Sequence, residues 1–212
     1  MGQLVVIEGL DGAGKRTLAD RLSGELQRRG ATVARIAFPR YDDDVHAELA
    51  RDALYGRLGD LSESVHGMAV LFALDRRAAA DPLRELVARH EVVLCDRYVA
   101  SNAAYGAARL HEDATGDFVS WVRELEIGRF GLPVPEIQLL LRVPVTLAAS
   151  RAAGRAEADP GRAADAFESD CGLQQRCAAV YDQLAACSWL GPWVQLDATD
   201  APGGVIDRLL TR

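Results

Sequence analysis

The sequence lacks the features of membrane proteins, secreted proteins and general nucleic-acid binders. No apolar run approaches the about eighteen residues that a spanning helix needs, and no signal-peptide pattern is present, so no membrane association is expected. The four cysteines show no C-x-x-C spacing, and we expect them to be reduced thiols in a cytoplasmic protein. Basic residues number 24 against 31 acidic ones, and the resulting net charge of −7 disfavours nucleic acid as a partner.

The size and composition of the chain fit one globular domain. Its 212 residues are 49% hydrophobic, which suffices for one sizeable core. No internal repeat, low-complexity segment or linker divides the sequence. We therefore expect a single domain over residues 1–212 with a small mobile insertion.

A glycine-rich segment lies between an apolar run at residues 4–7 and leucines that recur at helical spacing (Leu18, Leu22 and Leu26). The segment contains Gly9, Gly12, Ala13, Gly14, Lys15, Arg16 and Thr17. In a strand, turn and helix context, such glycines let backbone N–H groups point at a polyphosphate, and a lysine adds a point charge. The pattern predicts a phosphate-binding loop; the alternative is a glycine-rich turn with an exposed lysine.

The loop departs from the general P-loop pattern at one position. The residue after the lysine normally offers a hydroxyl to magnesium, but here it is Arg16, and the hydroxyl follows at Thr17. Magnesium is therefore expected to be held differently. Asp11 is a candidate, because a carboxylate beside bound phosphates needs an intervening cation. The alternative is a turn-forming Asp11 with a solvated side chain.

Strand-like runs alternate with helical patterns along the chain. Strands are expected at 4–7, 32–38, 91–95, 136–143 and 193–196. Helices are expected after the glycine-rich segment, at 45–58, from a cap at Asp60 or Ser62 to about 80, from Asp81 and Pro82 onward, within 99–130, at 164–187 and at the carboxyl terminus. The organisation predicts an α/β protein with a P-loop NTPase fold, a five-stranded parallel sheet flanked by helices.

Candidate site residues, most of them polar, follow the carboxyl ends of three expected strands, where such a sheet binds its ligand. They are Asp11, Lys15 and Thr17 after the first strand, Phe38, Arg40 and Tyr41 at the second, and Asp96 and Arg97 after the third. Arg97, Ser101 and Tyr105 would share one helix face, with Asn102 beside them. Taken singly, Tyr105 could instead be a half-buried core residue and Asn102 a solvated helix residue.

Three arginines flank a turn in the second half of the chain. Arg151 and Arg155 share a helix face at a spacing where like charges repel unless an anion lies between them. A turn at residues 159–161 would bring Arg162 back toward them. In a chain with a phosphate-binding loop, residues 150–163 are predicted to form a short mobile lid over a transferred phosphoryl group. The alternative is an exposed charged loop.

Five segments together resemble the thymidylate kinase family, in its actinobacterial form. They are residues 8–15, 38–41, 72–76, 96–105 and the arginine lid, in order and spread over essentially the whole chain. The resemblance implies transfer of the γ-phosphoryl group of ATP to dTMP, giving dTDP and ADP, with magnesium. Together with the apolar helices expected at 45–58 and 62–80, it favours a symmetric homodimer.

The resemblance also implies roles for individual residues. The loop residues from Gly9 to Thr17 would bind ATP, with Lys15 on its phosphates. The residues implied to contact dTMP are Asp11, Phe38, Tyr41, Phe72, Arg76, Arg97, Asn102, Tyr105 and Asp165. Within this set, Phe72 would stack on the thymine while Arg76 and Asn102 face its edge, and Tyr105 would lie against the sugar and exclude a 2′-hydroxyl.

The remaining implied roles concern charge. Asp11, Tyr41 and Arg97 would surround the acceptor phosphate, with Arg97 bridging donor and acceptor. The lid arginines Arg151, Arg155 and Arg162 would neutralise the group in transfer. Asp11 and Glu168 would position magnesium through water, and Asp165 would reach the 3′-hydroxyl.

The chain departs from the family pattern in the lid region. Phe167 stands where the family carries a tyrosine, and Ala158 and Ala164 remove further arginines from the lid. We expect these departures to change rate or affinity and activity to survive. Two other functions are alternatives. A deoxynucleoside kinase would leave Arg97 and Tyr41 without an acceptor phosphate. A nucleotide-dependent switch would leave the lid arginines unexplained.

Overall fold

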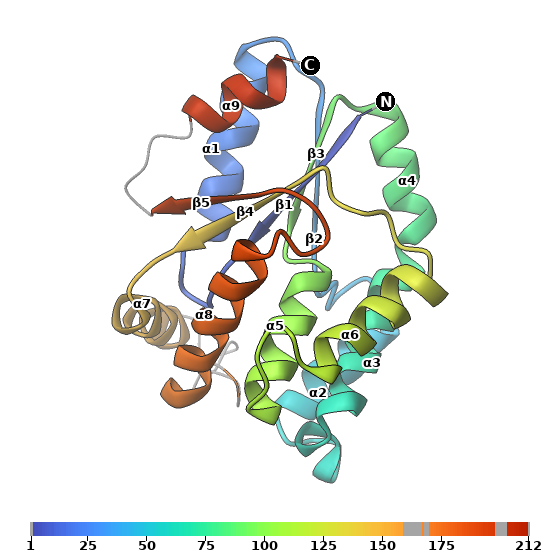
Figure 1. The fold of residues 1–212 in the computed structure, drawn as a ribbon, viewed down its shortest axis with the longest axis vertical. Helices are drawn as coiled ribbons and strands as arrows, with labels where there is room; N and C mark the ends of the chain where they lie inside the picture. Colours follow the sequence, from blue (N-terminus) through green and yellow to red (C-terminus); the bar gives the residue numbers. More distant parts are fainter. Residues whose placement is uncertain (1, 159–166, 168–169, 198–202, 212) are drawn as a thin grey trace.

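A five-stranded sheet forms the centre of the molecule (Figure 1). The computed structural model describes residues 2–158, 167, 170–197 and 203–211. The strands are β1 (Gln3–Glu8), β2 (Val33–Ala37), β3 (Val92–Asp96), β4 (Ile137–Arg142) and β5 (Trp193–Asp197). All neighbours pair in parallel in the order β2-β3-β1-β4-β5, which confirms the expected parallel sheet.

Helices cover both faces of the sheet. Along β1, Leu4 and Val6 pack into one core while Val5 and Ile7 pack into the other, because successive strand side chains point to opposite faces. The helices on the Val5 side are α1 (Lys15–Arg28) and α9 (Gly203–Leu210). Those contributing to the Leu4 side include α4 (Ala80–Arg89), α5 (Val99–Leu110), α6 (Asp117–Arg123) and α8 (Cys171–Ala186). This burial on both faces accounts for the continuous apolarity of the central strands.

The remaining helical elements lie around the site end of the sheet. They are α2 (Val45–Leu54), the 3-10 turn η1 (Gly59–Glu63), α3 (Val65–Ala78), the π-helical segment η2 (Glu124–Arg129) and α7 (Val145–Ala158). α2 and α3 share a small core of their own, made by Ala50, Ala53, Leu54 and Met68. Figure 1 places α2 and α3 together, below the sheet in that view.

The expected helix boundaries need three corrections. The long helix toward residue 78 is capped by Ser64, whose hydroxyl accepts from the Gly67 N–H, and not by Asp60 or Ser62. The helix expected at 45–58 ends at Leu54. The helix expected from 164 begins at Cys171, because the Asp170 side chain accepts from the Leu173 N–H and caps it.

The carboxyl ends of three adjacent strands lie side by side. Ile7 in β1 and Ala37 in β2 both pair with Asp96 in β3. Beyond the strands, the Arg97 N–H donates to the Ile7 carbonyl at 3.0 Å, and the Phe38 N–H donates to the Asp96 carbonyl at 2.9 Å. The loops that carry the expected site residues therefore start from one edge of the sheet.

Two features bear on the expected environment of the chain. None of the helices in the described part combines the length and apolarity needed to cross a membrane. All four cysteines are free; Cys95 and Cys177 are buried, whereas Cys171 and Cys187 are exposed.

Candidate active site

The glycine-rich loop after β1 has the backbone conformation of a phosphate cradle. Gly9, Gly12 and Gly14 all have positive φ, which favours glycine. At Gly12 a Cβ atom would lie 2.0 Å from the carbonyl oxygen of Ala148, so α7 packs directly against the loop. The first intrahelical hydrogen bond of α1 runs from the Leu18 N–H to the Gly14 carbonyl, so the N–H groups of residues 15–17 have no partner within the helix and can bind an anion at its N-terminus.

Lys15 is nearly buried at the start of α1. Its Nζ donates to the carbonyl oxygens of Gly9 at 3.1 Å and Leu10 at 2.8 Å. Burial and the charge of Arg97 lower the pKa of Lys15 to about 8, although Asp11 opposes the shift. Ala13 is buried behind the loop, whereas Arg16 and Thr17 are exposed in the first turn of α1. The loop therefore holds an ammonium group that can exchange carbonyl partners for phosphate oxygens.

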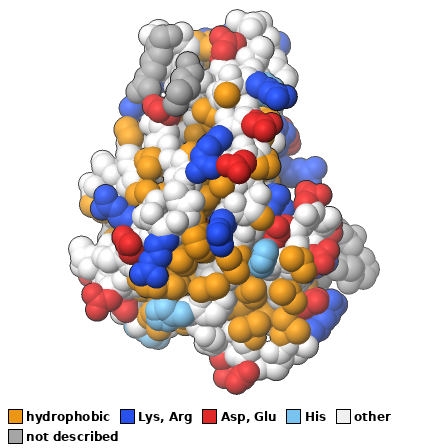
Figure 2. Space-filling view, turned by 90° about the vertical axis from the view of Figure 1, so that its right-hand side faces the viewer, with side chains coloured by type: hydrophobic (Ala, Val, Ile, Leu, Met, Phe, Trp, Pro, Cys, Tyr) orange, Lys and Arg blue, Asp and Glu red, His pale blue; other side chains and the backbone are white. Residues whose placement is uncertain are grey.

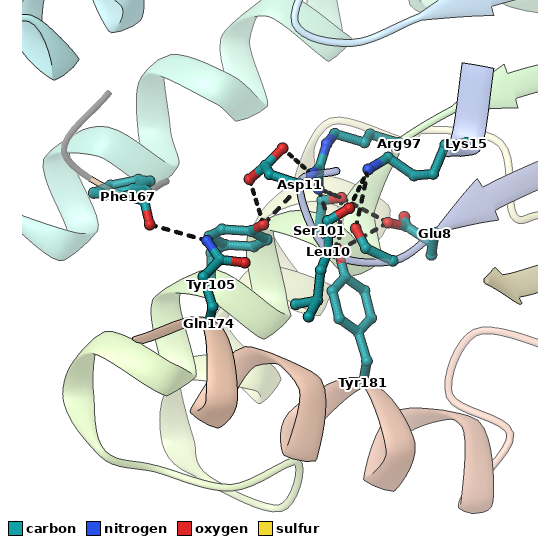
Figure 3. A network of polar contacts seen from close by, with 11 residues as sticks. Glu8, Leu10, Asp11, Lys15, Arg97, Ser101, Tyr105, Phe167, Gln174 and Tyr181 are labelled. Carbon is teal, nitrogen blue, oxygen red and sulfur yellow. Dashed lines mark hydrogen bonds and ion pairs between the residues drawn. The ribbon is translucent and has the colours of Figure 1, made fainter. Parts of the chain in front are cut away.

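Asp11, Arg97 and Tyr105 form one hydrogen-bonded cluster beside this loop (Figure 3). The Arg97 Nη2 donates to Asp11 Oδ1 at 2.6 Å, and the Tyr105 hydroxyl donates to Asp11 Oδ2 at 2.6 Å. Burial by itself would raise the pKa of Asp11, but Arg97 and Lys15 outweigh burial and hold it well below its usual range. Burial and the Asp11 carboxylate raise the pKa of Tyr105, so its hydroxyl stays a neutral donor.

Glu8 supports Arg97 from behind without contacting it. Its fully buried carboxylate accepts from the Ser101 hydroxyl at 2.6 Å and the Tyr181 hydroxyl at 3.0 Å, and from the Tyr98 N–H at 2.9 Å. The Arg97 Nη1 in turn donates to Ser101 Oγ at 3.0 Å and to the Tyr181 hydroxyl at 3.5 Å. Burial raises the pKa of Glu8, although the Ser101 hydrogen bond and the Arg97 charge oppose the shift.

This support explains the backbone at Arg97. Arg97 has φ 64, a left-handed conformation that is uncommon for residues other than glycine. Such a conformation persists where surrounding contacts determine it, and it is concentrated at functional sites. Sequence reasoning missed the part of Tyr181, which resembles any apolar-face tyrosine of a helix, and assigned no role to the buried Glu8.

Arg76 and Asn102 lie at a second buried carboxylate, Glu126. Arg76 donates to it twice, from Nε to Oε2 at 2.5 Å and from Nη2 to Oε1 at 2.8 Å. The Asn102 Nδ2 donates to the same Oε1 at 2.8 Å and to the Ala69 carbonyl at 3.0 Å. The structure thus brings the two residues expected to face the base together. Glu126 was not foreseen, because no local pattern marks it as buried.

The expected aromatic residues occupy different environments. Phe38 is buried in the core, with its ring 6.0 Å from that of Tyr98. Tyr41 carries Arg51 over its ring at 5.5 Å. Phe72 is half-buried against the small core shared by α2 and α3. Their contacts with a nucleotide remain predictions.

Arg40 was placed at the end of β2, and it ties that end to α3. Its Nε donates to Asp75 Oδ1 at 2.8 Å, and its backbone N–H donates to Asp75 Oδ2 at 3.0 Å. Its Nη2 also reaches Asp44, the capping residue of α2, at 3.2 Å. Arg40 therefore fixes the chain between β2 and α2 next to the residue that precedes Arg76.

Only part of the expected lid lies within the described residues. Arg151 is exposed on α7, one turn beyond the Ala148 contact with the loop. Arg155 belongs to the same helix, and its side chain is not described; Arg162, Asp165 and Glu168 lie outside the described residues. Phe167 has its ring 6.2 Å from the Tyr105 ring, and Arg109 lies over it at 4.7 Å. The roles of these residues stay predictions.

Comparisons with known proteins agree with this geometry. A family model described as thymidylate kinase matches residues 7–201. The chain is 53% identical over 200 residues to the thymidylate kinase of two strains of Mycobacterium tuberculosis, covering 94% of each chain. It is 35% identical over 185 residues to that of Xanthomonas oryzae pv. oryzae, covering 86% of this chain and 72% of the relative. With a family model that spans most of its length and these relatives, the chain belongs to the thymidylate kinase family.

Proposed function

We propose that this chain transfers the γ-phosphoryl group of ATP to the 5′-phosphate of dTMP, giving dTDP and ADP. The observation that carries the proposal is the position of Arg97. It lies beside the lysine of the phosphate loop, and it is bound to Asp11 within that loop and to Tyr105 on α5. A cation in that place can contact donor and acceptor phosphates at once, as phosphoryl transfer requires.

Arg97 and Lys15 are proposed to bind the phosphates by exchanging their present hydrogen-bond partners for phosphate oxygens. Arg97 is neutralised by Asp11, and Lys15 is bonded to loop carbonyls. Phosphate oxygens would replace these partners, so the cations change neighbours without losing hydrogen bonds. Positioned cations that already lie in a water-poor site stabilise developing charge with little reorganisation.

Tyr105 is proposed to select the sugar. Its hydroxyl is held by Asp11, and its ring is flanked by Tyr181 at 6.5 Å and Phe167 at 6.2 Å. A ring fixed in this way cannot move aside for a 2′-hydroxyl. Deoxyribose would therefore be preferred to ribose, with Phe72 stacking on the base.

Asp11 is proposed to hold magnesium with the phosphates. Its carboxylate stays ionised and partly exposed, which fits a hard cation that prefers oxygen ligands. Within residues 2–158, 167, 170–197 and 203–211, no three acidic, His or Cys side chains form a metal cluster, so water and phosphate oxygens would complete the coordination. When bound, magnesium would neutralise charge on the donor phosphates. Glu168 is proposed as the second carboxylate.

The arginines of residues 150–163 are proposed to close over the transferred group. α7 touches the phosphate loop at Gly12, and Arg151 lies one turn further along that helix. A helix anchored there would carry its arginines toward the donor side of the site. Arg155 and Arg162 would add charge to that of Arg151.

A homodimer is proposed through the surface of α2 and α3. Val45 and Leu49 are one helical turn apart on α2 and are 58% and 38% exposed. Figure 2 shows hydrophobic side chains gathered on the lower half of the face where Figure 1 places α3 and α6. We expect light scattering at micromolar concentration to give a dimer, and the Val45→Asp, Leu49→Asp double variant to give a monomer. A wild-type monomer would contradict the proposal.

A panel of acceptors tests the reaction. The full chain is incubated with ATP, magnesium and one of dTMP, dUMP, dCMP, dGMP or thymidine, and release of ADP is measured. We expect dTMP to give the highest kcat/KM. Thymidine as the better acceptor would support the deoxynucleoside kinase alternative, and no turnover with any acceptor would support a nucleotide switch.

A further inference from the structure

A single buried carboxylate ties together two side chains from different helices. Glu126 is fully buried in η2, a π-helical segment of the kind often found at functional sites. Its Oε1 accepts from Arg76 on α3 and from Asn102 on α5, each at 2.8 Å, and its Oε2 accepts from Arg76 at 2.5 Å. Both partners are themselves buried, so these contacts do not compete with bulk water.

The contacts leave one orientation for the Asn102 amide. An amide can present either its NH2 group or its carbonyl oxygen to a neighbour. Here both neighbours, Glu126 Oε1 and the Ala69 carbonyl, can only accept, so the NH2 group must face them. The Oδ1 atom of Asn102 is thereby turned to the other side.

Two polar atoms remain unpaired at this point. Neither Asn102 Oδ1 nor Arg76 Nη1 has a partner among the described residues. Among those residues, the one side-chain N or O atom that is both buried and unpaired is Gln174 Oε1. Asn102 Oδ1 and Arg76 Nη1 are therefore both accessible to solvent. Each belongs to a side chain that is otherwise held tightly. A fixed acceptor and a fixed donor are thus presented from two residues that share one carboxylate oxygen.

We propose that Glu126 is the positioning residue that makes this site specific for thymine over cytosine. The proposal rests on the proposed function, in which Arg76 and Asn102 face the base. Thymine offers an N3–H donor beside the O4 acceptor, which matches an acceptor beside a donor. Cytosine offers the reverse, an N3 acceptor beside an amino donor, and would meet like groups at both positions.

The discrimination arises because Glu126 prevents rearrangement. A free asparagine could rotate its amide to suit cytosine, but rotation here would set its carbonyl oxygen against Glu126 and the Ala69 carbonyl. A site that leaves buried polar groups unpaired with the wrong substrate rejects it strongly. Glu126 touches neither base nor phosphate and acts through its two partners.

The test compares Glu126→Gln with a matched control, Glu124→Gln. Glu124 begins the same segment, but its side chain is 65% exposed. We measure kcat and KM for dTMP and dCMP, with thermal melting to confirm folding. For Glu126→Gln we expect kcat/KM for dTMP to fall about tenfold or more, chiefly through KM, and the dTMP to dCMP ratio to fall about tenfold. The control should keep both values.

A double-mutant cycle separates specificity from structure. Asn102→Ala removes the oriented amide while leaving the pair between Arg76 and Glu126 in place. If Glu126 acts through Asn102, the double variant should lower the substrate ratio little further than either single variant. A change that affects dTMP and dCMP equally in every variant would mark Glu126 as merely structural.

The outcomes are distinct. A folded Glu126→Gln enzyme with an unchanged ratio overturns the proposal. If Glu126→Gln does not fold, Asn102→Ala decides, and an unchanged ratio in that variant overturns it. A wild-type enzyme that shows no preference for dTMP rejects the proposed function itself, before any variant is considered.

Discussion

Two arginines, Arg76 and Arg97, are proposed to serve the base end and the phosphate end of the acceptor site, and they are held in different ways. Arg76 forms a two-pronged pair with Glu126, and the side chains are 4% and 0% exposed. Arg97 makes one short bond to Asp11, with side chains 14% and 24% exposed, and its other bonds go to neutral hydroxyls. Arg76, at the proposed base end, thus has a permanent counter-ion in Glu126. Arg97, at the proposed phosphate end, has a counter-ion in Asp11 that a phosphate could displace.

The difference fits the chemistry of the two proposed ligands. A base edge is neutral, so the arginine that reads it must keep its own counter-ion or leave a charge buried and uncompensated. A phosphate is itself a counter-ion, so the arginine that meets it needs one that can be displaced. Arg97 therefore needs support that does not neutralise it, and the Ser101 and Tyr181 hydroxyls supply that support.

The largest effect is expected at the phosphate end. Arg97→Ala should lower kcat about a thousandfold or more, because the cation shared by both phosphates is lost. Steady-state ADP release measures the rate, and circular dichroism confirms the fold. Arg89→Ala, at an exposed position on α4, is the control and should leave turnover unchanged. Near-normal turnover in folded Arg97→Ala would contradict the assignment.

At the base end, the expected loss is in stability. Arg76→Ala leaves the Glu126 carboxylate buried without its cation, and we expect the free energy of unfolding to fall by about 3 kcal/mol or more. Urea denaturation measures it. Arg77→Ala removes the exposed neighbour, which stacks on Phe130, and should cost much less. Equal losses at Arg76 and Arg97 would remove the distinction between permanent and provisional pairing.

The pH dependence distinguishes donor from acceptor binding. Burial and the charge of Arg97 lower the pKa of Lys15 to about 8, so the neutral fraction of the lysine grows above that pH, and we expect ATP binding there to include uptake of a proton. KM for ATP should then rise with pH above about 8, by up to about tenfold per unit. KM for dTMP should stay flat there, because Arg97 remains charged. A flat ATP profile would show that the lysine charge is unimportant.

The smallest effect is expected at the sugar. Tyr105→Ala should narrow the preference for dTMP over its ribonucleotide counterpart several-fold, because the ring that fills the space of a 2′-hydroxyl is gone. The kcat/KM ratio of the two substrates measures the change. Tyr105→Phe is the matched control: it keeps the ring but loses the hydrogen bond to Asp11, and it should retain the preference. An unchanged ratio in Tyr105→Ala would reject the steric role.

The fold was predictable because its signals are local. The run at residues 4–7 is apolar without interruption, as a strand covered on both faces must be, and Gly9, Gly12 and Gly14 mark the turn that follows. Helix starts were less predictable. Asp60, Ser62 and Ser64 all stand in one polar stretch, and any of them has a side chain that can cap a helix.

The candidate site was predictable from topology where its residues follow strands, whereas Glu126 and Tyr181, which come from helical segments, were missed. Asp11 and Arg97 follow β1 and β3, so topology alone brings them together. Glu126 is one of two acidic residues in its segment, and its partner Arg76 is distant in sequence, so only the packing of three helical segments reveals it. Tyr181 likewise meets Arg97 only because α8 packs on α5.

The close contact between Gly12 and Ala148 joins the phosphate loop to α7 at position 12. The two backbones touch directly there. No side chain separates the loop that would bind the donor from the helix that carries Arg151. Even a methyl group at position 12 would force the loop and α7 apart, because it would lie 2.0 Å from the Ala148 carbonyl oxygen. We therefore expect binding at the loop and the position of the proposed lid to be coupled at Gly12, a residue without a side chain.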